Sequence, residues 1–204
     1  MRLVLLLMLF LLVNLYIFWG WFFVFSKNSR SIIDLLLGSF LVWCAHVLLI
    51  EMFSALLNLI RLEFVVTVSL LSSLPLWAYS KKHIFNSIKF ILNRMWCFGK
   101  RMPVWGWIPL LIVIVGWLWG LWIIIYNPPL GWDTYMYHIP IAALRLQYGD
   151  LRRLESSWLQ IEGFPEVGEM FVLWNMIFFN SQFIADFVQW PFWVFGTLAL
   201  IGIA

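Results

Sequence analysis

Long apolar runs dominate this sequence, and they constrain its fold more than any other feature. A helix that spans a bilayer needs about 20 apolar residues, and inside lipid only a helix or a closed barrel satisfies its own backbone hydrogen bonds. Only 11% of the residues are charged, against about 25% in soluble domains. The sequence therefore predicts an all-α membrane protein, a multi-span bundle of about five to six transmembrane helices. The apolar runs lie at 3–25, 32–60, 64–79, 104–126 and 183–204, with a shorter one at 165–180.

Charged residues are sorted along the chain and predict its orientation. The segment 80–103 contains six basic residues and no carboxylate, which by the positive-inside rule makes it a cytoplasmic loop. The segment 127–168 carries five carboxylates against three arginines and is predicted to be an outer loop on the trans side. Two regions follow. Residues 1–103 hold the N-terminal transmembrane helices and the basic loop, and residues 104–204 hold the span 104–126, the loop 127–168 and the spans 165–180 and 183–204.

The small number of charges also excludes some functions. A formal net charge of +3, sorted by side of the membrane, does not suggest a nucleic-acid partner. The two cysteines, Cys44 and Cys97, lack the spacing of a metal or redox motif and are interpreted as small apolar fillers.

A juxtamembrane helix is expected inside the outer loop. Ile139, Ala142, Ala143 and Leu146 recur at the i, i+3, i+4, i+7 spacing of a single helix face. Arg145 lies off that face, which is typical of a helix on the membrane surface. Gly149 is well placed to end it.

The strongest cluster of reactive residues is Gly131–Pro140, directly after the span 104–126. Asp133 and Tyr137 would share a helix face at i, i+4, with His138 beside them. A carboxylate, a phenol and an imidazole at the interface suit group transfer, with Asp133 as general base. From spacing alone, a capping role for Asp133 is the more common explanation.

A second cluster, Phe164–Glu169, opens the short apolar run at 165–180. Pro165 suits a first helical turn, and the helix dipole would stabilise Glu166 and Glu169 there. Two carboxylates facing the loop of Asp133 alternatively indicate a shared polar cavity. The arginines of the loop could bind a phosphate through their guanidinium geometry, or equally anchor lipid headgroups; they are Arg145, Arg152 and Arg153.

Polar residues inside the spans are costly in lipid and are expected to face the bundle interior. Glu51, Ser54 and Asn58 form a stripe at i, i+3, i+7, for which hydrogen bonding between helices is a more common explanation than an ion path. The other intramembrane polar residues are Asn14, His46, Asp186 and Gln189.

Taken in order, Gly131–Pro140, Gly149-Asp150 and Phe164–Glu169 resemble the first catalytic loop and following helix of the GT-C superfamily of membrane glycosyltransferases. The likeness is to the bacterial branch similar to dolichyl-phosphate-mannose protein mannosyltransferases and to the lipid A aminoarabinose transferase. It covers about residues 104–204 and implies a partial GT-C fold. The chain departs from many members by having Thr134 after Asp133 instead of an acidic pair, and three spans before the loop instead of one.

The resemblance implies an enzyme that transfers a sugar from a polyprenyl-phosphate carrier to an envelope lipid, glycan or protein. Asp133 would be the catalytic residue. Substrate-binding residues would be Tyr137, His138, Arg145, Arg152, Arg153, Glu166 and Glu169. No cofactor is predicted, and Asp133, without an acidic neighbour, argues against a divalent metal.

The same resemblance implies a bacterial inner-membrane protein with the loop 127–168 on the periplasmic or extracellular side. Members of the family have further spans, so we expect the 204 residues to be the N-terminal portion of a larger enzyme. The alternative is a non-catalytic membrane subunit or a lipid-carrier transporter that binds the same lipid-linked substrate.

Overall fold

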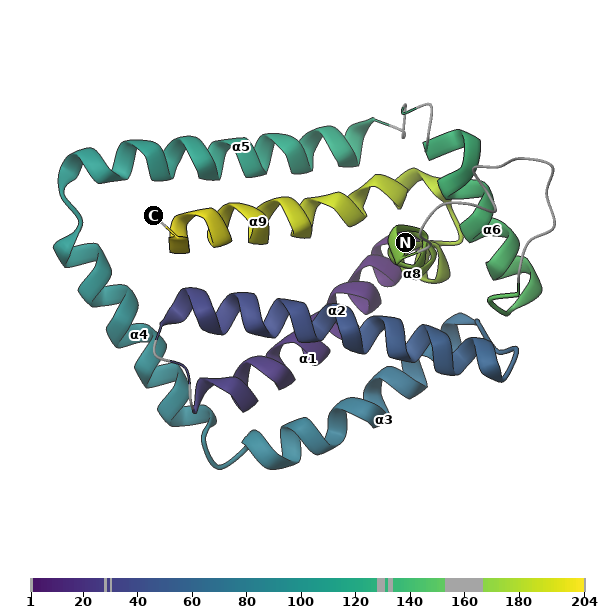
Figure 1. The fold of residues 1–204 in the computed structure, drawn as a ribbon, viewed down its shortest axis with the longest axis horizontal. Coiled ribbons are helices and arrows are strands. Elements are labelled where there is room, and N and C mark those ends of the chain that lie inside the picture. The colour runs from purple at the N-terminus through teal and green to yellow at the C-terminus, as the bar shows by residue number, and fades with distance from the viewer. Residues whose placement is uncertain are drawn as a thin grey trace.

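Every regular element of the described chain is a helix (Figure 1). The computed structural model describes residues 2–27, 29, 31–127, 131, 134–152 and 167–203, and no strand occurs among them. The helices are α1 (Arg2–Ser26), α2 (Ile32–Leu56), α3 (Leu62–Ser80), α4 (Ile84–Arg101), η1 (Val104–Gly106), α5 (Trp107–Tyr126), η2 (Thr134–His138), α6 (Ile139–Tyr148), α8 (Val167–Phe179), η3 (Gln182–Val188) and α9 (Gln189–Ile203).

Five of these helical segments are long and apolar enough to cross a membrane. They are Arg2–Ser26, Ile32–Leu56, Leu62–Ser80, Val104–Tyr126 and Ala185–Ile203, and each coincides with an apolar run of the sequence. The prediction of an all-α, multi-pass integral membrane protein is therefore confirmed.

The described part of the run at 165–180 forms a helix that is too short to cross a membrane. This helix, α8, has 13 residues, which at 1.5 Å per residue reach only about 20 Å. Figure 1 views α8 nearly along its axis while the long helices run across the picture, so α8 lies across the bundle. Every side chain from Glu169 to Phe179 is buried, as expected for a helix that is apolar on all sides.

Aromatic contacts join α8 to α1 and form the centre of the core. The Phe10 ring lies 5.2 Å from the ring of Phe178 and 5.3 Å from that of Phe179. Trp174 is 1% exposed, and its indole N–H donates a 3.1 Å hydrogen bond to Asn14 Oδ1. This core fixes α8 beneath α6 at one end of the bundle.

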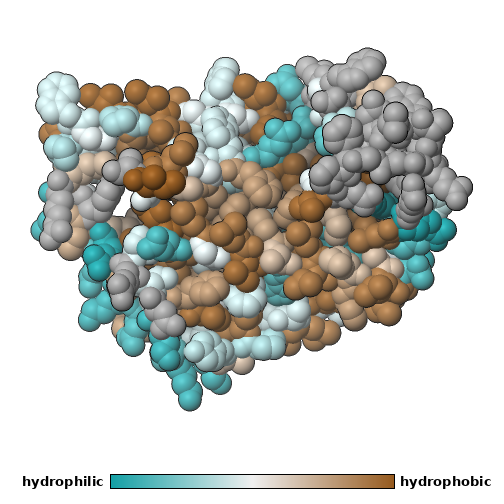
Figure 2. Space-filling model, in the orientation of Figure 1, coloured by the Kyte–Doolittle hydropathy of each residue, from teal (hydrophilic) through white to brown (hydrophobic). Residues whose placement is uncertain are grey.

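The two ends of the bundle carry different structures. In Figure 1, α4 crosses the ends of the long helices on the left, whereas α6 and α8 lie at the right. Figure 2 shows apolar side chains over the middle and hydrophilic ones toward the α4 end.

The segment 80–103 is not the predicted loop, because α4 occupies most of it. Its apolar residues recur at Ile84, Ile88, Ile91 and Met95, which is helical spacing. The loop prediction rested on the position of this segment between two apolar runs.

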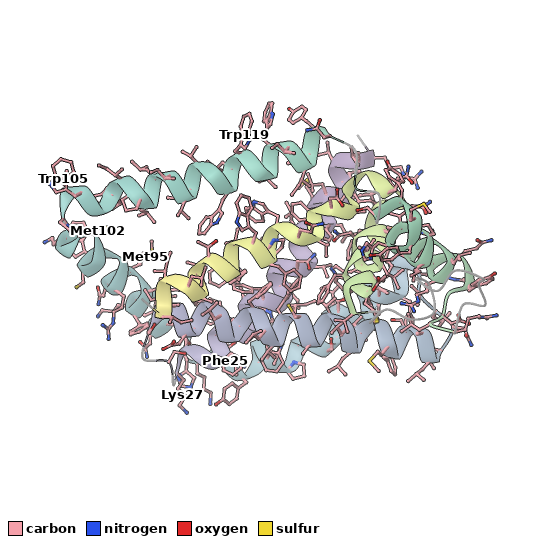
Figure 3. All side chains as sticks on the ribbon, turned by 45° about the horizontal axis from the view of Figure 1, so that its top comes forward. Phe25, Lys27, Met95, Met102, Trp105 and Trp119 are labelled. Atoms are coloured by element: carbon pink, nitrogen blue, oxygen red, sulfur yellow. The ribbon has the colours of Figure 1, made fainter. Side chains whose placement is uncertain are left out.

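Helices α5 and α9 pair with each other and leave one face of α5 uncovered. The Trp190 indole N–H donates a 2.9 Å hydrogen bond to the Trp117 carbonyl. Gly120 allows the close approach, since a Cβ there would lie 2.2 Å from the Trp193 ring. Trp105 and Trp119 point outward (Figure 3) and are 79% and 64% exposed, as lipid-facing side chains of a span would be.

Candidate functional site

The two sequence clusters that flank the outer loop meet in space. His138, the last residue of the π-helical turn η2, places Nδ1 2.8 Å from Oε1 of Glu169, in the first turn of α8. The His138 side chain is 34% exposed and that of Glu169 only 3%. A buried carboxylate that holds an imidazole whose other edge reaches the surface is a common way to orient a base.

Glu169 therefore does more than complement the helix dipole. Its second oxygen, Oε2, is buried without a hydrogen-bond partner among the described residues. Asp186, from η3, also acts electrostatically on His138. Glu169 thus contacts the imidazole directly, and Asp186 from a third element is within electrostatic reach of it.

Tyr137 lies directly beside this pair, with its ring 4.1 Å from the His138 ring. The predicted grouping of Tyr137 with His138 is therefore present. Asp133, Arg153 and Glu166 lie outside the described residues.

Arg152 pairs with a carboxylate that the sequence analysis gave no role of its own. Its Nε donates a 2.7 Å hydrogen bond to Asp150 Oδ2, and its guanidinium lies 4.9 Å from the centre of the Tyr148 ring. The hydrogen bond from Arg152 lowers the pKa of the Asp150 carboxyl below its ordinary value. The Arg152 side chain is still 58% exposed, so part of the guanidinium remains open to an anion.

Arg145 lies off the apolar face of α6 as predicted, but it is buried, whereas a surface helix would leave it exposed. The residue is 1% exposed, and its charge acts on Glu51 of α2, which is 0% exposed. Gly149 explains how α6 is held there: the helix ends at this residue as predicted, with φ +76°. The Gly149 carbonyl then accepts a 3.1 Å hydrogen bond from the Ile60 N–H, which fixes α6 to the turn between α2 and α3.

The polar residues predicted to face the bundle interior divide into two groups. His46 faces the interior as predicted, because it accepts a 3.0 Å hydrogen bond from the Trp21 indole and lies 2.8 Å from Ser72 Oγ. Asn14, Glu51 and Ser54 are also inside, whereas Asn58 and Gln189 are exposed and contradict the prediction. Asn58 fails because α2 ends at Leu56, after which the chain turns and the helical stripe stops.

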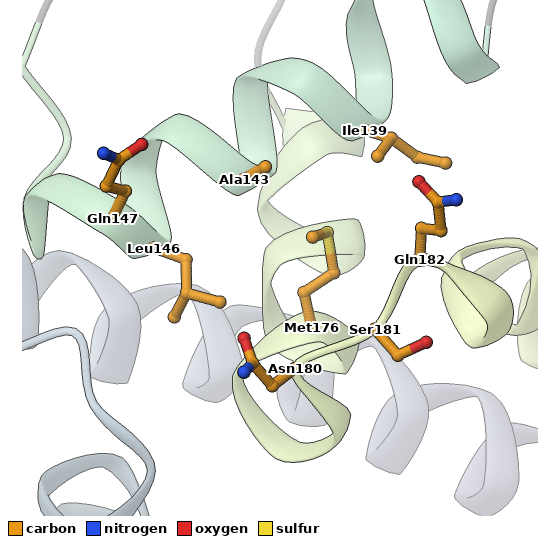
Figure 4. Close-up of a pocket in the computed structure, with 8 residues that line it drawn as sticks. All are labelled: Ile139, Ala143, Leu146, Gln147, Met176, Asn180, Ser181 and Gln182. Carbon is orange, nitrogen blue, oxygen red and sulfur yellow. The ribbon is translucent and has the colours of Figure 1, made fainter.

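Two cavities flank the site. One of about 540 Å³ lies between α6 and the chain that joins α8 to η3 (Figure 4). Its polar lining is Gln147, Asn180, Ser181 and Gln182, and none of the predicted site residues contributes to it. The other, of about 250 Å³, is lined mostly by aromatic side chains of α1, α2, α8 and the η3–α9 segment, with Asn14 and Asn175 as its polar members.

A metal site is not formed by the described side chains, in which no three His, Cys, Asp or Glu residues are grouped closely enough. The contact of His138 with Glu169 and the action of Arg145 on Glu51 were both missed by sequence reasoning. They join residues far apart in the chain, and no local spacing signals them. The pairing of Asp150 with Arg152 could have been predicted from the sequence, because only one residue separates them.

The fold and its burial pattern define an integral, multi-pass α-helical membrane protein with a polar cluster at one end of the bundle. No family model, curated protein or solved structure matches the chain.

Proposed function

We propose that this chain carries the first catalytic loop of a GT-C glycosyltransferase, which moves a sugar from a polyprenyl phosphate to an envelope acceptor. The observation that supports this most directly is the 2.8 Å contact between His138 and Glu169. The two residues come from the separate segments, Gly131–Pro140 and Phe164–Glu169, on which the resemblance depends. Their contact brings both segments to one site at the end of a span, where a lipid-linked donor presents its phosphate.

In the proposed reaction the acceptor hydroxyl attacks the anomeric carbon of the donor sugar. Asp133 takes the hydroxyl proton, a new bond forms between the acceptor oxygen and that carbon, and the bond to the phosphate oxygen breaks with inversion. Polyprenyl phosphate leaves with the electron pair. General-base catalysis of this kind contributes roughly 10²–10⁴-fold in rate.

The remaining site residues bind and orient the substrates in this proposal. Arg152, which keeps an exposed guanidinium, and Arg153 hold the donor phosphate. Tyr137, His138, Glu166 and Glu169 line the acceptor side. Arg145, being 1% exposed, reaches a phosphate only if α6 moves, so its first role is within the protein.

The proposal places the protein in a bacterial inner membrane, with residues 127–168 on the periplasmic side. The alternative is a non-catalytic subunit or lipid-carrier transporter that uses the same site for binding only. Against transport stands the position of the polar cluster at the end of the bundle, since transport sites usually lie near the bilayer midplane.

Release of polyprenyl phosphate separates the two functions, because a carrier or scaffold releases none. The complete protein that contains this chain is reconstituted in proteoliposomes with polyprenyl-phosphate sugars and envelope acceptors, and free polyprenyl phosphate is measured. We expect release by the unmodified protein and a loss of at least about 100-fold in Asp133→Asn. Glu155→Gln, which removes a carboxylate of the same loop, is the matched control and should retain release. Full activity of D133N would refute the role of Asp133, and binding of donor without release would favour the alternative.

A further inference from the structure

The segment between α3 and α5 holds a helix that the proposed function does not use. Helix α4 is amphipathic, with its basic residues on one side and its apolar residues on the other. The basic side chains Lys89, Arg94 and Lys100 fall on one arc at helical spacing. The opposite arc is apolar and largely uncovered: Phe85, Ile88, Leu92, Met95 and Trp96 are between 43% and 78% exposed.

Contacts with the bundle fix the rotation of α4 about its axis. Ser87 Oγ lies 2.6 Å from Ser26 Oγ, at the end of α1. Ile84 and Ile91 pack against the cluster that contains Phe22. One edge of α4 is thus bound to the protein, and this anchoring leaves both the exposed apolar arc and the basic arc without a protein neighbour among the described residues.

Helix α4 contains cations but no carboxylate of its own. No Asp or Glu occurs anywhere between Glu63 and Asp133, and neither ion pair of the described residues involves α4. Instead, two cations stack on aromatic rings of the same helix. Arg94 lies 5.4 Å from the centre of the Phe90 ring, and Lys100 lies 4.7 Å from that of Trp96. Such contacts keep the apolar stems on the ring while the charged ends stay near water.

The position of α4 matches the depth of a lipid headgroup. It crosses the end of the bundle between the end of α3 and the start of α5, opposite α6 (Figure 1). Hydrophilic side chains are visible at this end in Figure 2, as they are at the opposite end. Next to α4, Val104 and Trp105 are 80% and 79% exposed, and tryptophan is enriched at membrane interfaces. Its 18 residues extend about 27 Å along the membrane surface.

We propose that α4 lies in the bilayer interface and that its basic arc binds the headgroups of anionic phospholipids. The apolar arc then enters the acyl region, while Lys89, Arg94 and Lys100 meet the phosphates. An amphipathic helix with cations on its polar face binds a lipid surface by these two contributions together. The occupant is a lipid because the long helices adjoining α4 already require a bilayer at that depth, and because α4 itself carries cations and no carboxylate.

Cys97 provides a reporter on this helix. It is exposed and lies on the basic arc, so a fluorophore attached there senses the headgroup region. The complete chain, with Cys44→Ser, is placed in nanodiscs of phosphatidylcholine and phosphatidylglycerol. One of the two lipids carries a headgroup spin label that quenches on contact, and the ratio of quenching by the two labelled lipids measures the lipid preference.

We expect labelled phosphatidylglycerol to quench several-fold more strongly than labelled phosphatidylcholine at low salt. The preference should fall in 0.5 M NaCl, because interfacial charges are screened. In K89Q/R94Q it should fall to near one, because these two cations supply most of the attraction to the anionic headgroup. The matched control R2Q/R61Q removes two cations at the opposite end of the bundle and should keep the preference.

Equal quenching by the two lipids, or an equal loss of preference in R2Q/R61Q, would overturn the proposal. Weak quenching by both lipids together with Cys97–Cys97 cross-linking would overturn it in favour of a second copy of the chain on this face. Lipid binding does not require sugar transfer, so this result and that of the transferase experiment are independent.

Discussion

The buried charges Glu51 and Arg145 should be energetically coupled across the interface of α2 and α6. Both side chains are almost completely buried, at 0% and 1% exposure, and Arg145 is the cation that acts on the Glu51 carboxylate. The two Glu51 oxygens accept no hydrogen bond within the described part of the chain, so the attraction operates beyond hydrogen-bond distance. In an effective dielectric of about 20, two unit charges roughly 5–10 Å apart attract by about 2–3 kcal/mol.

A double-mutant cycle measures this coupling. Glu51→Met and Arg145→Met replace each charge with an apolar side chain of comparable length. Each single variant removes one member of the buried pair, at a cost of roughly 3–5 kcal/mol. We expect the double variant E51M/R145M to lose about 2 kcal/mol less than the sum of the two single variants, which is about a 30-fold difference in the unfolding equilibrium.

The assay is reversible unfolding of the purified chain by SDS in mixed micelles, followed by tryptophan fluorescence. The control cycle combines Glu63→Met, an exposed carboxylate at the start of α3, with R145M and should be additive. A coupling below about 0.5 kcal/mol, within the usual error of additivity, would refute the pairing, as would equal coupling in the control. If E51M alone does not fold, recovery of folding in E51M/R145M supports the same conclusion.

Two further predictions concern the loop end of α6. Gly149→Ala should destabilise the chain by about 1 kcal/mol or more in the same assay. The residue has φ +76°, and the new Cβ would lie 3.1 Å from the Asn58 carbonyl oxygen. Unchanged stability would contradict the role of Gly149 in docking α6. Arg152→Gln should lower stability at neutral pH, because Arg152 depresses the pKa of Asp150 in the folded protein. A depressed carboxyl pKa stabilises the folded state at any pH above the pKa of the same group in the unfolded chain. That contribution is lost as the pH falls through the pKa of the group in the folded protein. In thermal unfolding scans in nonionic detergent, the difference between wild type and R152Q should therefore shrink as the pH is lowered below about 4, and a difference independent of pH would contradict the pairing.

The sequence alone determined the membrane class, the five spans and the end of α6. Apolar runs of about 20 residues have one stable solution in lipid, and a glycine after a helical repeat is a local signal. Helix α4 could also have been predicted from the sequence, because apolar residues recur at helical spacing within residues 84–95. The segment lies between two long apolar runs, however, and its own apolar residues are too few and too widely spaced to form a span.

Tertiary structure decided the geometry of the site. An apolar run such as 167–179 has the same composition whether it spans a bilayer or lies across a protein core, and only its packing against α1, α2 and α6 distinguishes the two. Arg145 falls on the predicted polar side of α6, but the neighbouring α2 carries a buried carboxylate that holds the cation inside. His138 and Glu169 are 31 residues apart, and their contact depends on where α8 docks. Contacts of this kind depend on the relative placement of whole helices, which residue spacing along one helix does not encode.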